Sequence, residues 1–288
     1  MDYKQNISQA LNDYITQTGK SAAKVADEIS TQSGRLSEAT ISKIRNGKGY
    51  EQISERMFRR VASYLGIDKW VSVETDNLSN IFNLCKTARR EGCMRGVVGY
   101  TGAGKTTAFK MFQKQNNGVY YLLCKESMSK REFARAIAEV LGITDEGTTY
   151  SLIRKIAAKL RGSKQAKPLL ILDDAGKMND KKLAIVQEIY DEADGAAGIV
   201  LGGVSYLYDN LAKAAKLNKK GMPELNRRVG GWLVLDQAQN SPSRAEVSAI
   251  CQANGVSTED INQFVKANFA NFGDLREAII NYFNNQES

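Results

Sequence analysis

The residues best suited to chemistry lie between positions 99 and 107, where glycine, lysine and threonine recur at a characteristic spacing. The stretch Gly99-Tyr-Thr-Gly-Ala-Gly-Lys-Thr106 has the form G-x-x-x-x-G-K-[ST], with an apolar run before it and a helical pattern after it. Glycines allow the backbone N–H groups to turn inward onto phosphate oxygens, and the start of the next helix favours an anion. The pattern therefore predicts a phosphate-binding loop; the alternative is a glycine-rich turn that binds nothing.

Within this loop, lysine and threonine have different expected roles. Lys105 would place its charge on the β- and γ-phosphates, and the Thr106 hydroxyl would be a ligand of Mg²⁺. The predicted nucleotide-binding residues are Gly99, Thr101, Gly102, Ala103, Gly104, Lys105, Thr106 and Thr107.

Two adjacent carboxylates form the second half of the predicted site. Asp173 and Asp174 follow the apolar run Leu169–Leu172, at the end of a strand where open α/β sheets bind ligands. We expect Asp173 to hold Mg²⁺ with Thr106, and Asp174 to polarise the attacking water. The predicted cofactors are ATP and Mg²⁺, and the predicted reaction is hydrolysis of ATP to ADP and phosphate.

Three arginines are further candidates for contact with the phosphates. Arg227 and Arg228 precede the last apolar run, where one of them would reach the γ-phosphate of a neighbouring subunit; the alternative is a solvated basic turn. Arg276, near the start of a helix in the tail, would fold back onto the nucleotide; the alternative is a surface pair with Asp274 or Glu277.

Alternating strand and helix patterns position these residues. Capping boxes at Ser129–Glu132 and Ser243–Glu246 mark two helix starts. Strands that alternate with helices predict an α/β fold with a parallel sheet flanked by helices. The expected strands are the apolar runs 94–99, 119–124, 168–173, 198–203 and 232–236. The predicted domains are an all-α helix-turn-helix domain at 1–68, a linker at 69–76, a nucleotide-binding domain at 77–240 and a helical lid at 241–288.

The composition excludes several classes of protein. With 42% apolar and 25% charged residues, the 288-residue chain is typical of a soluble globular protein. The net charge of +8 favours an anionic partner, and the absence of histidine excludes a His general base, a Ser-His-Asp triad and any His-containing metal site. Four cysteines without a CxxC pair indicate reduced thiols. No apolar run is long enough to cross a bilayer and no signal peptide is evident, so we expect a cytoplasmic protein without a membrane partner.

The first 68 residues have a helical pattern that resembles the helix-turn-helix of phage repressors. A helix over 21–29, a long turn over 30–36 and a second helix from Ser37 are followed by a third helix containing Met57 and Val61. In that geometry the second helix enters the major groove. The alternative is a small helical bundle that docks on a protein. The predicted DNA contacts are Thr40, Lys43, Arg45 and Lys48.

The complete pattern resembles the AAA+ ATPases, and within them the transposition-targeting group of Mu B, TnsC and IstB. The resemblance rests on GVVGYTGAGKTT, on PLLILDDA, on the arginines before the last strand and on a compact helical lid with G-x-x-R. It implies a P-loop AAA+ fold, assembly into a ring or helical filament on duplex DNA, and a transposase partner. Two positions depart from the family. Asp174 stands where glutamate is usual, which implies slow hydrolysis. The family usually has Asn, Thr or Ser as a sensor residue at the end of the fourth strand, whereas this strand ends in Gly202-Gly203-Val204, with Ser205 as the substitute.

Basic residues outside the first domain would then face the DNA backbone. The resemblance implies such contacts for Lys125, Lys130 and Arg131, after the second strand. A second basic run comprises Lys213, Lys216, Lys219, Lys220, Arg227 and Arg228. Basic loops on one face of the assembly would hold a DNA backbone without reading sequence. The alternative for both groups is a solvated helix face.

The sequence thus predicts an ATP-dependent, non-specific DNA-binding ATPase that delivers target DNA to a transposase, with hydrolysis that is slow and stimulated by DNA or a partner. Two alternatives stay open: a replication initiator or helicase loader, which shares every motif, and a transcription regulator whose ATPase domain senses ATP.

Overall fold

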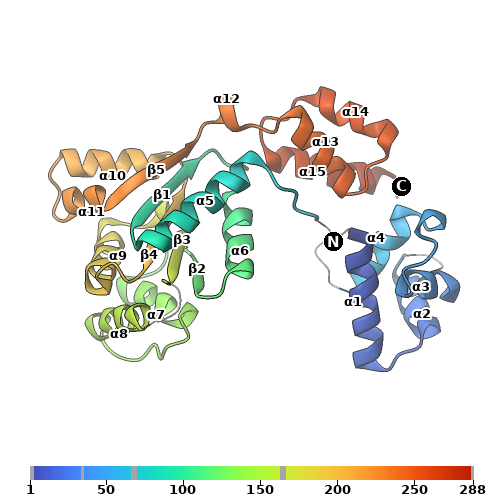
Figure 1. The fold of residues 1–288 in the computed structure, drawn as a ribbon, viewed down its shortest axis with the longest axis horizontal. Coiled ribbons are helices and arrows are strands. Elements are labelled where there is room, and N and C mark those ends of the chain that lie inside the picture. The colour runs from blue at the N-terminus through green and yellow to red at the C-terminus, as the bar shows by residue number, and fades with distance from the viewer. Residues whose placement is uncertain (1–2, 34–35, 66–69, 163–166, 287–288) are drawn as a thin grey trace. The chain divides into compact units, whose positions relative to one another are not determined.

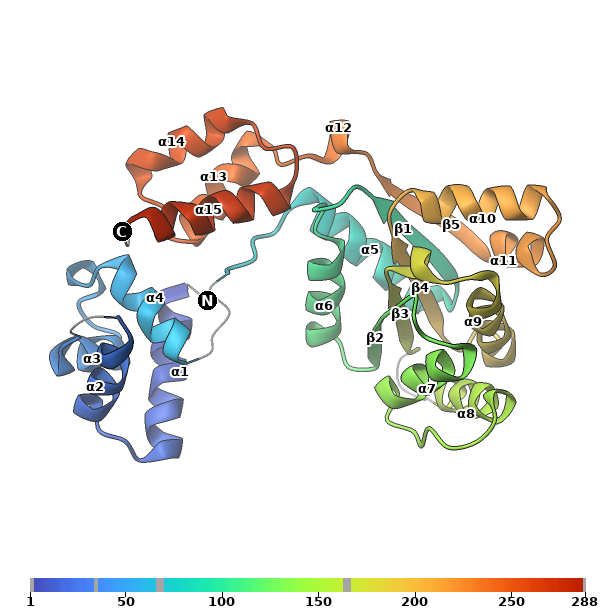
Figure 2. The same ribbon diagram turned by 180° about the vertical axis from the view of Figure 1, so that it is seen from behind.

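The computed structural model describes residues 3–33, 36–65, 70–162 and 167–286 (Figures 1 and 2). The chain divides into two compact units. The first, which we call the helical unit, contains residues 1–73, 242–269 and 274–288. The second, the sheet unit, contains residues 74–241 and 270–273.

The sheet unit is built on five parallel strands in the order β2-β3-β4-β1-β5, which confirms the predicted α/β fold. The last strand begins at Val229, earlier than the predicted 232, because Gly230 and Gly231 interrupt the apolar run where the pairing with β1 is irregular. The strands are β1 (Met94–Gly99), β2 (Val119–Leu123), β3 (Leu169–Asp173), β4 (Gly198–Gly203) and β5 (Val229–Leu235).

Helices cover both faces of this sheet, because successive side chains of a strand point to opposite sides. Leu169 and Ile171 of β3 pack in the apolar cluster of α5 and α6, whereas Leu170 and Leu172 pack in that of α7 to α11. Figures 1 and 2 show α6 on one side of the sheet and α7 to α9 on the other. These helices are α5 (Asp76–Glu91), α6 (Lys105–Gln115), α7 (Lys130–Val140), α8 (Thr149–Arg161), α9 (Asp180–Ala193), α10 (Tyr206–Lys216) and α11 (Met222–Arg228).

The second basic run lies partly in helices, as in the alternative of a solvated helix face. Lys213 and Lys216 stand in the last turn of α10, and Arg227 and Arg228 in the last turn of α11. Cations are favourable there because the last carbonyls of a helix carry partial negative charge.

The first part of the helical unit has its own apolar core, which includes Leu11, Ile29, Ile41 and Phe58. Ser37 caps its third helix by accepting the N–H of Thr40, as the pattern predicts. The predicted turn over 30–36 was too long, because α2 continues to Ser33. The helices are α1 (Tyr3–Thr18), α2 (Ala22–Ser33), α3 (Glu38–Arg45), the short helix η1 (Tyr50–Gln52) and α4 (Glu55–Tyr64).

Helices from the end of the chain belong to the same unit: α13 (Arg244–Ala253), α14 (Thr258–Ala267) and, from Asp274 onwards, α15 (Phe272–Gln286). Asn254, buried after α13, exchanges two hydrogen bonds with the backbone of Val71, at 2.9 and 3.0 Å. Arg59 of α4 donates to the carbonyl of Asn254, and its guanidinium lies 3.3 Å from the centre of the Phe283 ring. These contacts join the two parts of the helical unit, and the predicted four-domain division stays a prediction.

In the described part of the chain, no helix is both long and apolar enough to cross a membrane.

Candidate nucleotide-binding site

The phosphate-binding loop lies between β1 and α6, at the carboxyl edge of the sheet. Gly102 and Gly104 both have φ of +84°, a conformation that side chains with a Cβ rarely adopt. Gly104 is the N-cap residue of α6, so the first N–H groups of that helix open onto the loop. Ala103 is buried, while Thr101 and Thr107 are exposed. This is the local geometry that the motif predicts for binding phosphates.

Lys105 is buried inside this loop, with only 9% of its surface exposed. Its ammonium donates to the carbonyl oxygens of Gly99 and Tyr100, at 2.9 and 2.8 Å. Burial lowers the pKa of Lys105, and the charges of Asp173 and Asp174 oppose that effect. A strong anion in the loop would be a better partner for this ammonium than two neutral carbonyls.

Asp173 and Thr106, predicted to share a metal ion, are in direct contact. The Thr106 hydroxyl donates to Oδ2 of Asp173 at 2.7 Å, and the backbone N–H of Asp174 donates to Oδ1 at 2.9 Å. Only 1% of Asp173 is exposed. Among the described residues, no cluster of three or more Cys, Asp or Glu side chains is placed to hold a metal. A single carboxylate and a hydroxyl fit Mg²⁺, which keeps several waters and takes its remaining ligands from substrate phosphates.

Tyr121 of β2 is a part of this site that sequence reasoning missed. Its hydroxyl donates to the same Oδ2 of Asp173 at 2.9 Å. Burial and the nearby charge of Asp173 raise the pKa of Tyr121, which therefore stays protonated and able to donate. Only the pairing of β2 with β3 brings the two residues together. A tyrosine on the strand next to the carboxylate was the one available signal.

Asp174 takes a left-handed conformation, with φ of 54°. Its Oδ2 accepts a hydrogen bond from the ammonium of Lys177 at 2.7 Å, and both side chains are partly exposed. Asp174 therefore stands beside Asp173 with a cation paired to one of its two carboxylate oxygens.

At the end of β4, where a polar sensor residue was expected, the chain has Gly202 and Gly203. A Cβ at Gly202 would lie 2.4 Å from the ring of Phe109 and 3.3 Å from Oδ1 of Asp173, so packing against these residues requires glycine. Ser205 is exposed at the start of α10.

Three segments outside the motif support the phosphate-binding loop. The side-chain amide of Asn77 donates to the carbonyls of Ala103 and Asn240, at 3.2 and 3.1 Å. The N–H of Phe272 donates to the carbonyl of Gly102 at 3.1 Å. These contacts join residues that are far apart in sequence, so no local pattern reveals them.

Arg227 and Arg228 lie at the opposite edge of the sheet from the loop. The seven residues of β5, at about 3.3 Å each, separate them from the carboxyl edge by about 23 Å. Arg228 donates to Oδ1 of Asp191, whereas the side chain of Arg227 is exposed. Neither belongs to its own chain's phosphate site.

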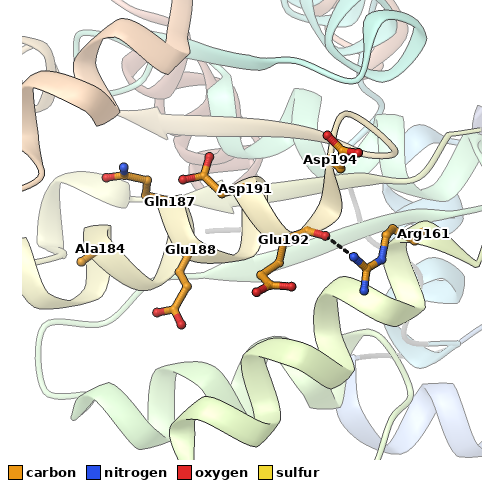
Figure 3. Close-up of a pocket in the computed structure, with 7 residues that line it drawn as sticks. All are labelled: Arg161, Ala184, Gln187, Glu188, Asp191, Glu192 and Asp194. Carbon is orange, nitrogen blue, oxygen red and sulfur yellow. Dashed lines mark hydrogen bonds between the residues drawn. The ribbon is translucent and has the colours of Figure 1, made fainter.

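The shallow pocket of about 510 Å³ drawn in Figure 3 lies near this amino edge, on α8 and α9. Arg161 donates to the carbonyl of Glu192 there, at 2.7 Å. Because Glu188, Asp191, Glu192 and Asp194 give it a negative lining, the pocket is unsuited to a phosphate.

Arg276 belongs to the helical unit, on α15. Its guanidinium lies 5.6 Å from the centre of the Trp70 ring. Its predicted contact with the nucleotide stays a prediction.

The predicted DNA-binding residues form two groups. Thr40, Lys43 and Arg45 lie on α3, and Lys48 follows it, exposed. Lys43 donates to Gln52 at 2.7 Å and Arg45 to Asn12 at 3.1 Å.

The second group lies in the sheet unit. Lys125 follows β2, and Lys130 and Arg131 open α7; all three are exposed.

The fold and the site define the class of protein. A parallel sheet with a phosphate-binding loop after β1 and paired carboxylates after β3 is the arrangement of P-loop ATPases. A sequence profile described as AAA domain matches residues 90–211. The chain thus contains an AAA domain built on a P-loop fold.

The chain is also similar to the Mu B group of proteins. It is 28% identical over 195 residues to the Mu-like prophage FluMu DNA transposition protein B of Haemophilus influenzae, covering 65% of this chain and 63% of that protein. It is 25% identical to the ATP-dependent target DNA activator B of Escherichia phage D108 over 242 residues (81% of this chain, 74% of that protein) and to that of Escherichia phage Mu over 235 residues (78% and 72%). The match thus spans less than two thirds of the Haemophilus protein.

A solved structure described as a DNA replication initiation factor is 16% identical, with a TM-score of 0.43, and the match covers 70% of this chain and 57% of that one.

Proposed function

We propose that this chain is an ATP-dependent, non-specific DNA-binding ATPase that oligomerises on duplex DNA, as a ring or helical filament, and delivers target DNA to a transposase. The observation that carries the proposal is the convergence of Lys105, Thr106 and Asp173 at the carboxyl edge of the sheet. The similarity to proteins named ATP-dependent target DNA activator and DNA transposition protein supports the DNA and transposase partners. Four free cysteines support a reducing, cytoplasmic location.

In the proposed mechanism, the loop N–H groups and Lys105 bind the β- and γ-phosphates. Thr106 and Asp173 would hold Mg²⁺, which would supply positive charge to the phosphate oxygens. Tyr121 keeps the Asp173 carboxylate oriented, and Asp174, which also accepts a hydrogen bond from Lys177, orients the attacking water. The short side chain of Asp174 and this competing ion pair both support slow hydrolysis.

We expect Tyr121→Phe to reduce ATP hydrolysis about threefold to tenfold, because one hydrogen bond to a buried carboxylate is lost while the ring is kept. The measurement is steady-state hydrolysis across a Mg²⁺ titration, in which the variant should need more Mg²⁺. Tyr120→Phe, one residue earlier on the same strand, is the matched control. Equal activity of the two variants would contradict the role given to Tyr121.

The arginines at the amino edge would act on a neighbouring subunit. Because β5 separates Arg227 from its own phosphate-binding loop, contact with a γ-phosphate requires a second copy of the chain. Arg228 is paired with Asp191, so the exposed Arg227 is the better candidate for this contact.

Arg227→Ala is therefore expected to lower DNA-stimulated hydrolysis about 100-fold or more, as for other arginines that stabilise the transferred phosphoryl group. The affinity of the single chain for ATP should change less than about threefold, because the residue is remote from its own site. Arg228→Ala is the control, and its loss of a partly exposed ion pair should matter little. An unaffected Arg227→Ala enzyme, or equal losses in both variants, would overturn the assignment.

Two basic surfaces would contact DNA. Lys125, Lys130 and Arg131 would hold the backbone without reading sequence, and the α3 group would contact the groove and phosphates as a helix-turn-helix. A titration of salt on specific and random duplexes distinguishes these roles, because backbone contacts give a steep salt dependence without sequence preference.

The proposal is tested by negative-stain microscopy of the protein with duplex DNA. With a non-hydrolysable ATP analogue we expect rings or filaments, and with ADP or no nucleotide we expect dispersed protein. Protein that stays monomeric with the analogue and DNA would refute the proposed assembly, and equal DNA affinity with and without ATP would refute the coupling.

A further inference from the structure

Lys182 is a buried ammonium group outside the nucleotide site, and no motif singled it out. It lies in the first turn of α9, with 1% of its surface exposed. Its Nζ donates to the backbone carbonyl oxygens of Lys125 and Glu126, both at 3.0 Å. Because burying a charged lysine is unfavourable unless it is hydrogen-bonded, these two bonds are the reason that the ammonium is tolerated in this place.

The carbonyls that Lys182 holds belong to the segment 124–131, which carries the predicted DNA contacts of the sheet unit. This segment starts beside the backbone of Asp173, because the N–H of Cys124 donates to the carbonyl of Asp173 at 2.9 Å. It ends at the capping box of Ser129 and Glu132, which fixes the start of α7. Between these two points, the hydrogen bonds from Lys182 fix the backbone at Lys125 and Glu126.

The element that carries Lys182 also starts from the nucleotide site. After Asp174, the chain makes the short helix η2 (Ala175–Lys177) and enters α9 at Asp180. The side chain of Lys182 thus connects the backbone that follows Asp173 and Asp174 to the backbone at Lys125.

We propose that Lys182 is a positioning residue that couples the nucleotide site to the DNA-binding segment 124–131. The inference rests on the proposed function. A shift of Asp173 and Asp174 during ATP binding or hydrolysis moves the start of α9, and Lys182 passes that shift to the carbonyls of Lys125 and Glu126. By linkage, DNA bound to this segment changes the affinity for nucleotide by the same factor by which nucleotide changes the affinity for DNA.

The test is Lys182→Met, which keeps the length of the side chain but removes its donors and charge. Lys181→Met is the matched control, because Lys181 is the exposed neighbour with the same charge. We measure the affinity for a fluorescent ATP analogue, the affinity for a random duplex with and without the analogue, and the stimulation of hydrolysis by DNA. Lys182→Met should keep its nucleotide affinity within about twofold of the wild type. Its affinity for DNA in the presence of the ATP analogue should fall about tenfold, equivalent to about 1.4 kcal/mol, and the stimulation of hydrolysis by DNA should also fall about tenfold. Lys181→Met should match the wild type.

Lys182→Gln separates positioning from packing, because its amide still donates a hydrogen bond without carrying charge. It should recover part of the DNA stimulation that Lys182→Met loses. If Lys182→Met does not fold, hydrogen exchange of the wild-type chain is decisive: amides of 125–129 should change their protection when the ATP analogue replaces ADP. Unchanged exchange, or a Lys182→Met enzyme with normal DNA stimulation, would overturn the inference. A wild type without ATP-dependent DNA binding would instead overturn the proposed function.

Discussion

Lys105→Ala should lose nucleotide affinity by about 100-fold or more and should no longer assemble on DNA. The ammonium is the one charge buried within the loop, where low dielectric strengthens its attraction for the phosphates. About 100-fold corresponds to about 2.7 kcal/mol, within the range for a charge-assisted contact to a phosphate. The measurement is titration with a fluorescent ATP analogue, followed by sedimentation with duplex DNA.

This loss should not reflect unfolding. Burial lowers the pKa of Lys105, so the folded state binds this proton less tightly than the unfolded chain, and below the folded pKa the buried charge disfavours folding. Without nucleotide, Lys105→Ala should therefore unfold at a temperature close to that of the wild-type protein. Lys114→Ala, an exposed lysine on the same helix, is the control and should bind nucleotide normally. Full nucleotide affinity in Lys105→Ala would contradict the proposed site.

Asp173→Asn should reduce hydrolysis about 100-fold or more while the protein still binds nucleotide. The substitution keeps the shape of the side chain but removes the charge that would hold Mg²⁺, and it places an N–H₂ group beside the hydroxyls of Thr106 and Tyr121. The dependence of ATP affinity on Mg²⁺ should largely disappear. Titrations with and without Mg²⁺, together with steady-state hydrolysis, measure both effects.

Asp180→Asn is the matched control, because Asp180 is an exposed carboxylate on the segment that follows β3. It should retain wild-type hydrolysis and the wild-type response to Mg²⁺. If Asp173→Asn also retained them, the assignment of the metal carboxylate would be wrong.

The parts of the site predicted from sequence are those that depend on local geometry. Glycines at 102 and 104 predict positive φ, and the apolar run before Asp173 predicts a strand whose end carries a carboxylate. The capping boxes at Ser129 and Ser243 are present as predicted, because such a box involves only residues within one turn.

The parts that were missed depend on tertiary contacts. Tyr121 meets Asp173 only through the register of two strands, and Lys182 meets its carbonyls only because α9 packs beside the end of β2. Asn77 supports the loop from a helix that precedes β1. No spacing along the chain encodes these distances.

The distinction between Arg227 and Arg228 shows the same limit. The sequence presents two equivalent neighbours before the last strand, whereas folding brings Asp191 of α9 to Arg228 and leaves Arg227 exposed. Tertiary structure thus turns an ambiguous pair into two residues with different expected roles.

The most direct test is calorimetric titration of the wild-type protein with a non-hydrolysable ATP analogue in the presence of Mg²⁺. Binding through the loop, Thr106 and Asp173 predicts a saturable signal with a stoichiometry near one nucleotide per chain, which Lys105→Ala abolishes and removal of Mg²⁺ weakens. Two results would contradict the proposal that a bound triphosphate drives assembly on DNA. One is a folded wild-type protein that takes up no nucleotide, and the other is equal nucleotide affinity in the wild type and in Lys105→Ala.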